Sequence, residues 1–376
     1  MVEHDNDGAM VEMRKRDRSV RAMGCPLPNF DPLSLTGSLE SFSDGGGLFD
    51  VVVRPMLQKG HEGELCSWLK EMSLIPTVSN CPNLECDGRS LVWNPARIID
   101  KYIWSCPGCL RKLSIREKSF FFGIKCDLKM CLQLILGWCQ DIPCEIIASC
   151  LDIKKYVVKK IYDRCDELSA IYMKKHPEDW LLGGEGAILI VDEFPGGCMM
   201  EHQPDLNSAK KRNNNSHTII CIAEANAIPP RIWLHMIEAV PEPQKIDKLQ
   251  QGVNKCNMVK EALKEIAKHT VPGSYIVAND RASCCSYESL QSLRQYKIIS
   301  IEQLQKFDPP GKSKLLDNLE TIWQNAIEIC EEVQEATHTV GQHIIARHLW
   351  RQKFGTSIST AFQDMMNHIA EHYRFS

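Results

Sequence analysis

The chain has 376 residues, of which 44% are apolar, and a formal net charge of −4. This length suits two or three domains with their own hydrophobic cores rather than one small domain. The sequence excludes a membrane-spanning protein, because it has no apolar run of the ~18 residues that a transmembrane helix needs. The charged start MVEHDNDGAM also lacks the apolar core of a signal peptide, so we expect an intracellular protein.

The first 50 residues are polar and rich in Gly, Ser and Asp, which predicts a disordered tail over residues 1–50. The basic cluster between Arg14 and Arg21 is compatible with a nuclear-import signal and equally with a solvated tail. Residues 51–75 have the pattern of a short helical lead-in, and residues 78–122 are expected to form short strands and turns.

Two closely spaced cysteine pairs lie in this second region, namely Cys81-x4-Cys86 and Cys106-x2-Cys109. The second pair contains the Pro-Gly turn of a zinc knuckle, in which both thiolates reach one ion. Two knuckles provide the four thiolates of a tetrahedral site, so the spacing predicts structural Zn²⁺ in a zinc ribbon within residues 51–125. The alternative is unligated thiols. Most of the other cysteines among the 18 lie in apolar or helix-periodic stretches, which favours reduced core thiols.

Residues 126–180 have helical periodicity, with helices expected at 127–140, 143–151 and 154–175. Residues 88–175 hold 16 Lys/Arg against 9 Asp/Glu, whereas both flanks are acidic. Helices joined by short turns, the last of them basic, have the outline of a helix-turn-helix, although any three-helix bundle has the same outline. We therefore predict that 126–180 binds double-stranded DNA. The cations expected to contact it are Lys154, Lys155, Lys159, Lys160 and Arg164.

From residue 184 onward, strands alternate with helices in the sequence pattern. Three strands come first, and a helix then separates each later strand from the one before it. This order predicts an α/β fold with the mixed sheet of an RNase-H-like catalytic domain over 184–376. The expected strands are 187–194, 217–225, 231–240, 274–280 and 296–303, and the expected helices are 246–269, 286–295, 313–334 and the segment from 338.

Two acids, Asp192 and Asp280, each end one of these strands. Ligand sites in open α/β sheets cluster outside such strand ends, and neighbouring strands would bring the two carboxylates together. Carboxylates held close without a cation repel each other, so a bound divalent ion, Mg²⁺ or Mn²⁺, is the expected resolution. Either Asp could instead simply start a turn.

A third acid, Glu320, lies on a helical stripe with Leu316, Trp323 and Ile327. An unpaired carboxylate is costly to bury, and a metal site would explain its position. A side chain that reaches solvent at the edge of the stripe would explain it too, and Asp317 is the alternative third ligand. Three carboxylates around paired divalent ions suit phosphoryl transfer, with one ion activating water or a 3′-hydroxyl.

Together these motifs resemble the insertion-sequence-like DDE transposases that include the eukaryotic Merlin superfamily. The similarity covers roughly residues 78–366 and depends most on the cysteine ribbon followed by SIREKSFF, and on IVDEF, VANDRASCC and NLETIW in that order. The resemblance implies that Asp192, Asp280 and Glu320 bind the catalytic Mg²⁺ or Mn²⁺, and that the four ribbon cysteines bind Zn²⁺. It further implies a homo-oligomer that nicks DNA at terminal inverted repeats and joins it to a target, in the nucleus if the source is eukaryotic.

The chain departs from this family near the expected acids. PGGCMMEHQPDLNSAKKRNNNS follows the IVDEF strand where the family has a stretch rich in Lys, Arg and Gly, and Leu315–Leu316 replaces a His-Thr before the third acid. Residues 301–310 read IEQLQKFDPP, without the family's Asn-His. These departures support a second hypothesis, a domesticated DNA-binding or regulatory protein without catalysis. A third is a zinc-ribbon protein-interaction module with an inert RNase-H-like domain.

Overall fold

The computed structural model describes residues 42–77, 80–86, 90–196, 217–225, 231–238, 248–300, 303–304, 306 and 326–375. All of them belong to one compact unit of the chain, residues 31–376. The expected acids Asp317 and Glu320 lie outside the described residues, as does most of the expected tail. Among the helices that the structure describes, each is too short or too polar to cross a bilayer.

The described chain begins with packed residues rather than with the tail that we expected to reach residue 50. Phe42 and Phe49 are buried, and the Asp44 carboxylate accepts hydrogen bonds from the backbone N–H groups of Gly47 and Phe49 at 2.9 and 2.8 Å. Asp44 thus satisfies N–H groups at the start of a helical turn. Short helices follow: a π-helical turn η3 at Phe49–Val53, then α1 at Arg54–Met56 and α2 at Glu62–Glu71.

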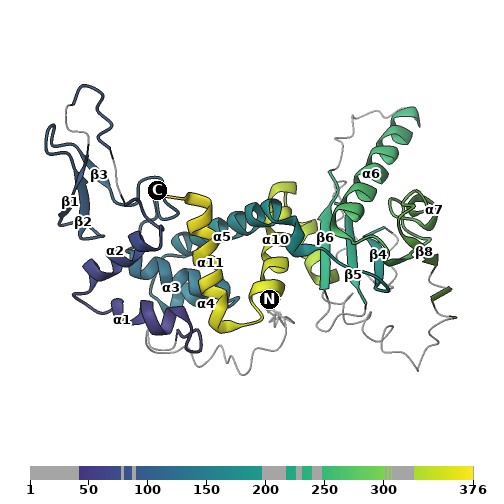
Figure 1. Cartoon of the computed structure of the whole chain (residues 1–376), viewed down its shortest axis with the longest axis horizontal. Coiled ribbons are helices and arrows are strands. Elements are labelled where there is room, and N and C mark those ends of the chain that lie inside the picture. The colour runs from purple at the N-terminus through teal and green to yellow at the C-terminus, as the bar shows by residue number, and fades with distance from the viewer. Residues whose placement is uncertain are drawn as a thin grey trace, which may run out of the picture. The chain divides into compact units, whose positions relative to one another are not determined.

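A small antiparallel sheet of order β1-β2-β3 follows α2 (Figure 1). Its strands are β1 (Val92–Pro95), β2 (Tyr102–Ser105) and β3 (Lys112–Ser114). Trp93 lies opposite Trp104 in the register, and Lys70 on α2 places its Nζ 3.3 Å from the centroid of the Trp93 ring. This cation–π contact and the buried Trp104 side chain fix the sheet to the helices before it.

The three helices expected between 127 and 175 are present as α3 (Leu128–Cys139), α4 (Cys144–Cys150) and α5 (Lys155–Lys175). Asp127 begins α3 by accepting a 2.7 Å hydrogen bond from the backbone N–H of Met130, which is the usual role of an N-cap Asp. Almost the whole of α3 is buried, because α5 packs against it together with α11 (Ile358–Tyr373). A short 3₁₀ helix, η4 (Pro177–Trp180), follows α5.

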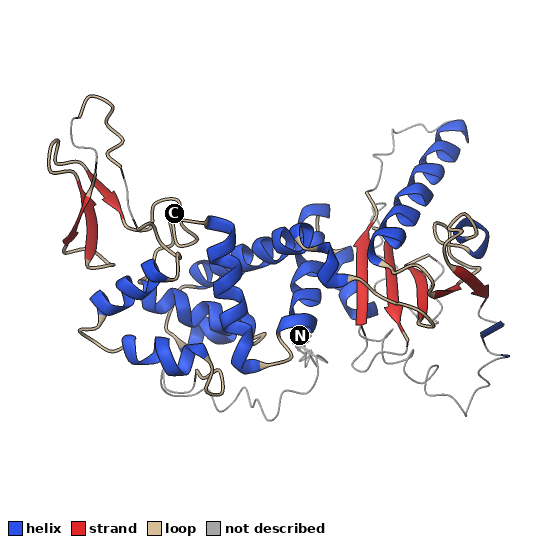
Figure 2. Cartoon of the chain, viewed as in Figure 1, coloured by secondary structure: helices blue, strands red, loops and turns tan. Residues whose placement is uncertain are grey.

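The second sheet has five strands in the order β6-β5-β4-β7-β8. Strands are drawn in red in Figure 2. The first three strands of this sheet along the chain pair antiparallel, and the last two run parallel to β4. The central strand β4 is apolar over Leu189–Val191 because both of its faces are buried. The strands are β4 (Ile188–Phe194), β5 (Ile219–Glu224), β6 (Arg231–Met236), β7 (Tyr275–Ala278) and β8 (Lys297–Ser300).

Helices connect the strands of the second sheet where the sequence pattern predicts them. The long helix α6 (Lys248–His269) leads from β6 to β7, and the single turn α7 (Tyr287–Leu290) replaces the longer helix expected between β7 and β8. Gly183 has a φ of +90° in the turn before β4, where a Cβ would collide with the hydroxyl of Ser274. Glycine is therefore required at this turn.

The C-terminal helices complete the helical core, although the sequence pattern grouped them with the sheet. α10 (His338–Phe354) packs on both α5 and β6, and α11 packs on α3 and α5. Trp350 on α10 lies in the hydrophobic core of the N-terminal helices, with its ring centroid 5.0 Å from that of Trp138, whereas Leu349 lies in the core of the sheet. Arg351 donates a 2.8 Å hydrogen bond to the Trp138 carbonyl. A single helix therefore belongs to both cores.

Candidate metal centre and sheet-edge acids

The four cysteines predicted as ligands lie together at one end of the small sheet. The Sγ atoms of Cys81 and Cys109 are 3.5 Å apart, as are those of Cys86 and Cys106, and all four lie within 4.8 Å of one another. A tetrahedral Zn²⁺ with bonds of ~2.3 Å spaces its thiolates by ~3.8 Å, so the four side chains fit such an ion. The cluster could hold a metal ion such as zinc.

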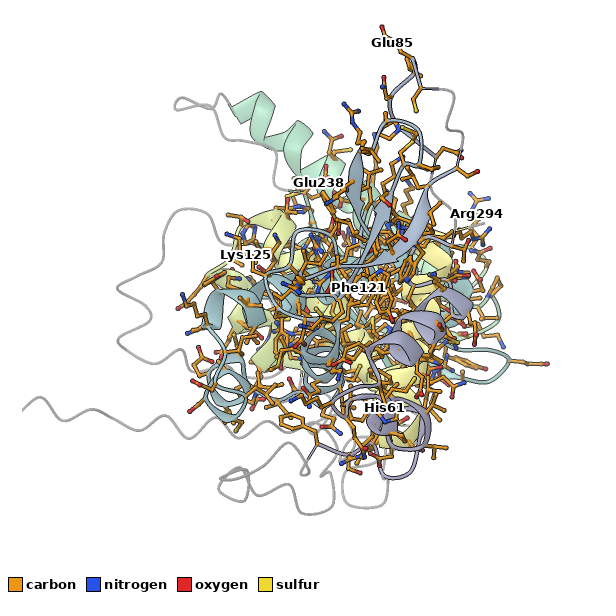
Figure 3. All side chains as sticks on the ribbon, turned by 90° about the vertical axis from the view of Figure 1, so that its left-hand side faces the viewer. His61, Glu85, Phe121, Lys125, Glu238 and Arg294 are labelled. Carbon is orange, nitrogen blue, oxygen red and sulfur yellow. The ribbon has the colours of Figure 1, made fainter. Side chains whose placement is uncertain are left out.

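The local fold explains how two distant pairs meet. Cys81 and Cys86 lie in a loop before β1 that an antiparallel bridge between Asn80 and Ser90 closes. Cys106 follows β2 directly, and Cys109 lies in the turn between β2 and β3. Glu85, in the first loop, lies at the outer end of this region (Figure 3).

The knuckle backbone favours the thiolate form of Cys106. Backbone N–H groups of Cys109 and Gly108 donate to its sulfur and, although burial acts in the opposite direction, lower the pKa of the thiol to about 6. The thiolate is the form that binds metal. The turn also needs the positive φ of 58° at Leu110, whose side chain is exposed.

At the second sheet, β4 and β7 are parallel neighbours, as the predicted convergence of the acids requires. Val191 is level with Ala278, so Asp192 on β4 lies beside the end of β7. Asp192 is fully buried, and its Oδ1 accepts 2.9 Å hydrogen bonds from the side-chain amide of Asn279 and from the backbone N–H of Glu193. Asp280 follows Asn279 and is exposed.

The hydrogen bonds of Asn279 and Glu193 near Asp192 were not predicted from the sequence. Glu193 is buried on β4, and its Oε2 accepts hydrogen bonds from the backbone N–H groups of Ser283 and Cys284 at 2.8 and 2.7 Å. Burial raises the pKa of Glu193, and these N–H donors act in the opposite direction. Two features of the sequence could have indicated these contacts. Glu193 lies on the opposite face of a buried strand from Asp192, and Asn279 directly precedes Asp280.

The third acid of the expected site is not placed. Among the residues that the structure describes, the four cysteines are the one group of three or more His, Cys, Asp or Glu side chains whose ligand atoms lie within 4.8 Å of one another. Asp192 and Asp280 thus have no third ligand within the described part of the chain, and both candidates for it, Glu320 and Asp317, lie outside that part. The metal-binding triad stays a prediction.

The five cations predicted to contact DNA lie at the start and in the first half of α5, and their contacts differ. Lys154 is exposed, Lys155 pairs with Glu145, and the Nζ of Lys159 lies 2.8 Å from Asp163. Lys160 and Arg164 instead donate to backbone carbonyls of the turn at residues 120–123, with Lys160 Nζ 2.8 Å from the Gly123 oxygen. The last two therefore also stabilise the fold.

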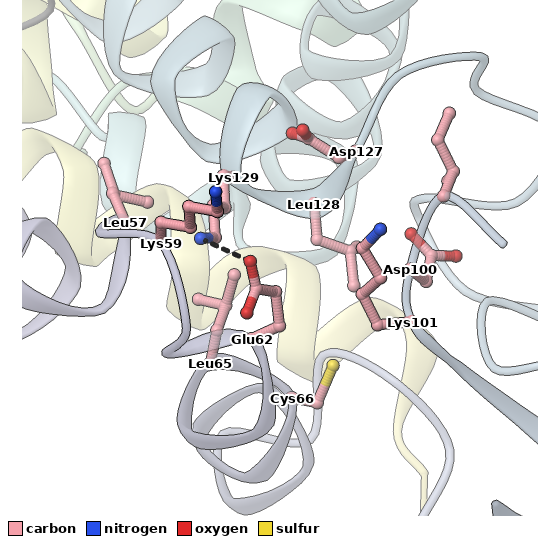
Figure 4. A pocket seen from close by; sticks show the side chains of 11 residues that line it. Leu57, Lys59, Glu62, Leu65, Cys66, Asp100, Lys101, Asp127, Leu128 and Lys129 are labelled. Carbon is pink, nitrogen blue, oxygen red and sulfur yellow. Dashed lines mark hydrogen bonds and ion pairs between the residues drawn. The ribbon is translucent and has the colours of Figure 1, made fainter. Parts of the chain in front are cut away.

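A hollow of about 230 Å³ lies between α2, the turn before β2 and the start of α3 (Figure 4). Its walls mix cations and anions, and Glu62 pairs with Lys129 across it at 3.1 Å. Ligand pockets usually measure about 300–1,000 Å³, so this hollow is smaller than a typical site for a small organic molecule.

Comparison with known proteins gives no relative: no protein-family model, curated protein or solved structure matches the chain. A functional assignment therefore depends on the chain's own fold and sites. Two features are available for it, the four-thiolate cluster and the parallel pairing of β4 with β7, whose last pair, Val191 and Ala278, directly precedes Asp192 and Asn279.

Proposed function

We propose that this chain is a transposase-like protein that binds double-stranded DNA and performs metal-dependent strand nicking and transfer. The observation that carries the proposal is the order of the second sheet, in which β4 lies between antiparallel β5 and parallel β7. Three antiparallel strands followed by two strands parallel to the first support the RNase-H-like domain expected from the sequence pattern. This order also sets Asp192 beside the strand end that leads into Asp280.

In this proposal Asp192, Asp280 and a third acid, Glu320 or Asp317, hold Mg²⁺ or Mn²⁺. Carboxylate oxygens are the ligands that these hard cations prefer, so the residue types fit the ion. The bound ions would supply activation of water or a 3′-hydroxyl and stabilise the leaving oxygen. The protein orients Asp192 through the amide of Asn279, which holds one carboxylate oxygen in a fixed position.

The small sheet and its cysteine cluster support a zinc ribbon as part of the same proposal. Zn²⁺ bound by Cys81, Cys86, Cys106 and Cys109 would be structural, because four thiolates complete its coordination and leave no open position. The basic first half of α5 supports DNA binding, since phosphate contacts by Lys and Arg dominate affinity for duplex DNA. A homo-oligomer on paired inverted-repeat ends belongs to this proposal as well.

Nicking of a supercoiled plasmid in the presence of Mn²⁺ tests the proposal without knowledge of the recognised DNA sequence. We expect nicking by the zinc-loaded wild-type chain and its loss in Asp192→Asn, in Asp280→Asn and in whichever of Glu320→Gln and Asp317→Asn removes the third ligand. Glu185→Gln, which neutralises an exposed acid in the turn before β4, is the control and should nick like the wild type. Equal nicking by wild type and Asp192→Asn would refute the assignment.

A second candidate function is a catalytically silent DNA-binding protein derived from such a transposase. The complete burial of Asp192 and its hydrogen bond with an amide favour this function, since the carboxylate is satisfied without a cation. DNA binding without nicking and without Mn²⁺ binding would select it. Absence of DNA binding would leave only a zinc-ribbon module that binds proteins.

A further inference from the structure

The loop that contains Asp280 is fixed by hydrogen bonds at both ends. Before Asp280, the side-chain amide of Asn279 bonds to Asp192 at 2.9 Å. After it, the backbone N–H groups of Ser283 and Cys284 bond to Glu193 at 2.8 and 2.7 Å. The side chains that accept these bonds are neighbours on β4.

Strand geometry explains how two consecutive residues of β4 accept hydrogen bonds from different parts of the loop. Successive side chains of a strand point to opposite faces, so Asp192 and Glu193 reach different parts of the same loop. Within the loop, the backbone N–H of Arg281 bonds to Oδ1 of Asn279 at 3.0 Å, and the N–H of Ala282 bonds to the Asn279 carbonyl at 3.2 Å. The backbone around Asp280 is thereby tied to β4 on both sides.

The burial of Glu193 needs a reason, because a buried carboxylate is costly unless it accepts hydrogen bonds. Two backbone N–H groups of the loop satisfy it, and without Glu193 those two groups would lose their partner. Cys284 and Cys285 are buried whereas Ser283 is exposed, so water could replace Glu193 at Ser283 but has little access to the N–H of Cys284. The side chain of Glu193 thus contacts the loop that follows Asp280.

We propose that Glu193 is a positioning residue, which fixes the loop 280–285 so that Asp280 stays at the end of β7 beside Asp192, ready to bind a divalent ion. This inference rests on the proposed function, since it presumes that Asp192 and Asp280 bind the ion. Residues that orient metal ligands commonly change metal affinity by about 10–100-fold when they are replaced.

Two substitutions separate the geometry of Glu193 from its charge. Glu193→Gln removes the charge but keeps an oxygen at the same reach, able to accept both N–H groups. Glu193→Asp keeps the charge but is one methylene shorter, so it no longer reaches Ser283 and Cys284. Glu185→Gln is again the control. Circular dichroism should show that each zinc-loaded full-length variant is folded.

The measurements are Mn²⁺ affinity, by electron paramagnetic resonance of free Mn²⁺, and amide hydrogen exchange at residues 283 and 284. We expect Glu193→Asp to bind Mn²⁺ about tenfold or more weakly and to exchange these amides faster, while Glu193→Gln stays within about threefold of wild type. Wild-type affinity in Glu193→Asp would overturn the inference but leave the metal site intact. Equal losses in both variants would also overturn it, because charge would then be the cause.

A different result would identify failure of the proposed function itself. If the wild type binds no Mn²⁺, or if Asp192→Asn leaves its affinity unchanged, the ion site is absent. The positioning role is then overturned together with it. Asp192→Asn therefore has to be measured in the same series.

Discussion

The side-chain amide of Asn279 donates a 2.9 Å hydrogen bond to Oδ1 of Asp192 across the parallel pair β7 and β4. An amide nitrogen cannot bind a cation, so this contact orients the carboxylate and satisfies it in the absence of metal. Asn279→Asp would instead place two carboxylates together, and each would disfavour the charged form of the other.

We therefore expect Asn279→Asp to melt several degrees below wild type without Mn²⁺, and to gain more from added Mn²⁺ than wild type does. Differential scanning calorimetry of the zinc-loaded chain, with and without Mn²⁺, measures both effects. Asn279→Ala removes the hydrogen bond without adding charge and is the matched control. The prediction would be wrong if added Mn²⁺ raised the Tm of Asn279→Asp no more than it raised the Tm of Asn279→Ala.

The cysteine cluster predicts one Zn²⁺ per chain. Elemental analysis of protein purified without chelator should find it, and Cys81→Ser should lose it, because three thiolates bind far more weakly than four. Cys150, an exposed cysteine on α4, provides the control Cys150→Ser, which should keep its zinc. Zinc removal should also change the fluorescence of Trp93 and Trp104. If the purified wild-type protein contained no zinc, the assignment of a zinc ribbon would be wrong.

The cations of α5 predict a salt-dependent contribution to DNA binding. Replacing Lys154, Lys155 and Lys159 with Gln should weaken binding to duplex DNA and lower the slope of log K against log salt by about one for each phosphate that the variant no longer neutralises. Fluorescence anisotropy over a salt series measures this slope. The exposed lysines of α6 offer a control of equal charge, in which Lys260, Lys264 and Lys268 are replaced with Gln. Equal weakening by both triple variants would show that the contribution is not specific to α5.

Lys160 and Arg164 are expected to behave differently from these three lysines. Both donate to carbonyls of the turn at residues 120–123, so Lys160→Gln or Arg164→Gln should lower stability by about 1 kcal/mol as well as DNA affinity. Urea unfolding of the single variants measures the stability effect. An unchanged midpoint would mean that solvent replaces these hydrogen bonds at no cost.

Acid should destabilise the helical core through His368. This residue is buried and accepts a 3.1 Å hydrogen bond from the Trp350 indole N–H, and burial lowers its pKa to about 4. The unfolded chain takes up the proton near pH 6.5 and the folded chain only near pH 4, so stability falls as the pH falls through that window. The loss amounts to about 3 kcal/mol.

His368→Gln removes this titration while keeping an acceptor for Trp350. The difference between the free energies of unfolding at pH 7 and pH 4 should therefore be smaller in His368→Gln by about 3 kcal/mol, as urea unfolding at each pH would show. His343→Gln, on α10, is the control and should follow the wild type. Loss of zinc at low pH affects all three proteins alike and cancels in the comparison. Identical pH dependence in all three would contradict this role of His368.

The sequence predicted those elements whose own pattern determines their structure. The apolar run before Asp192 predicted a strand buried on both faces, and the periodicity of 127–175 predicted three helices. The cysteine spacing predicted the four-thiolate cluster, because short knuckles constrain which thiolates can meet. In each case the information is local.

Features that depend on distant partners were not predictable in the same way. The helix expected from residue 338 includes the apolar residues of α11, but their pattern does not show that α11 packs on α3 and α5 rather than on the sheet. Glu193 has the pattern of a simple strand-end acid until the loop at 283–284 is placed beside it. Likewise, the position of Asn279 beside Asp192 depends on the register of two strands separated by α6.

The position of α11 also has a consequence for synthesis on the ribosome. Helices α3 to α5 are translated first, and the entire five-stranded sheet is translated before the residues of α11 that cover them. Until then, buried side chains that contact α11 lack part of their cover, such as Cys139 on α3, whose Sγ lies 3.7 Å from the Ala361 carbonyl oxygen. A nascent chain therefore exposes these surfaces for as long as the five strands are being synthesised, and exposed apolar surface of this kind makes a folding intermediate prone to aggregate.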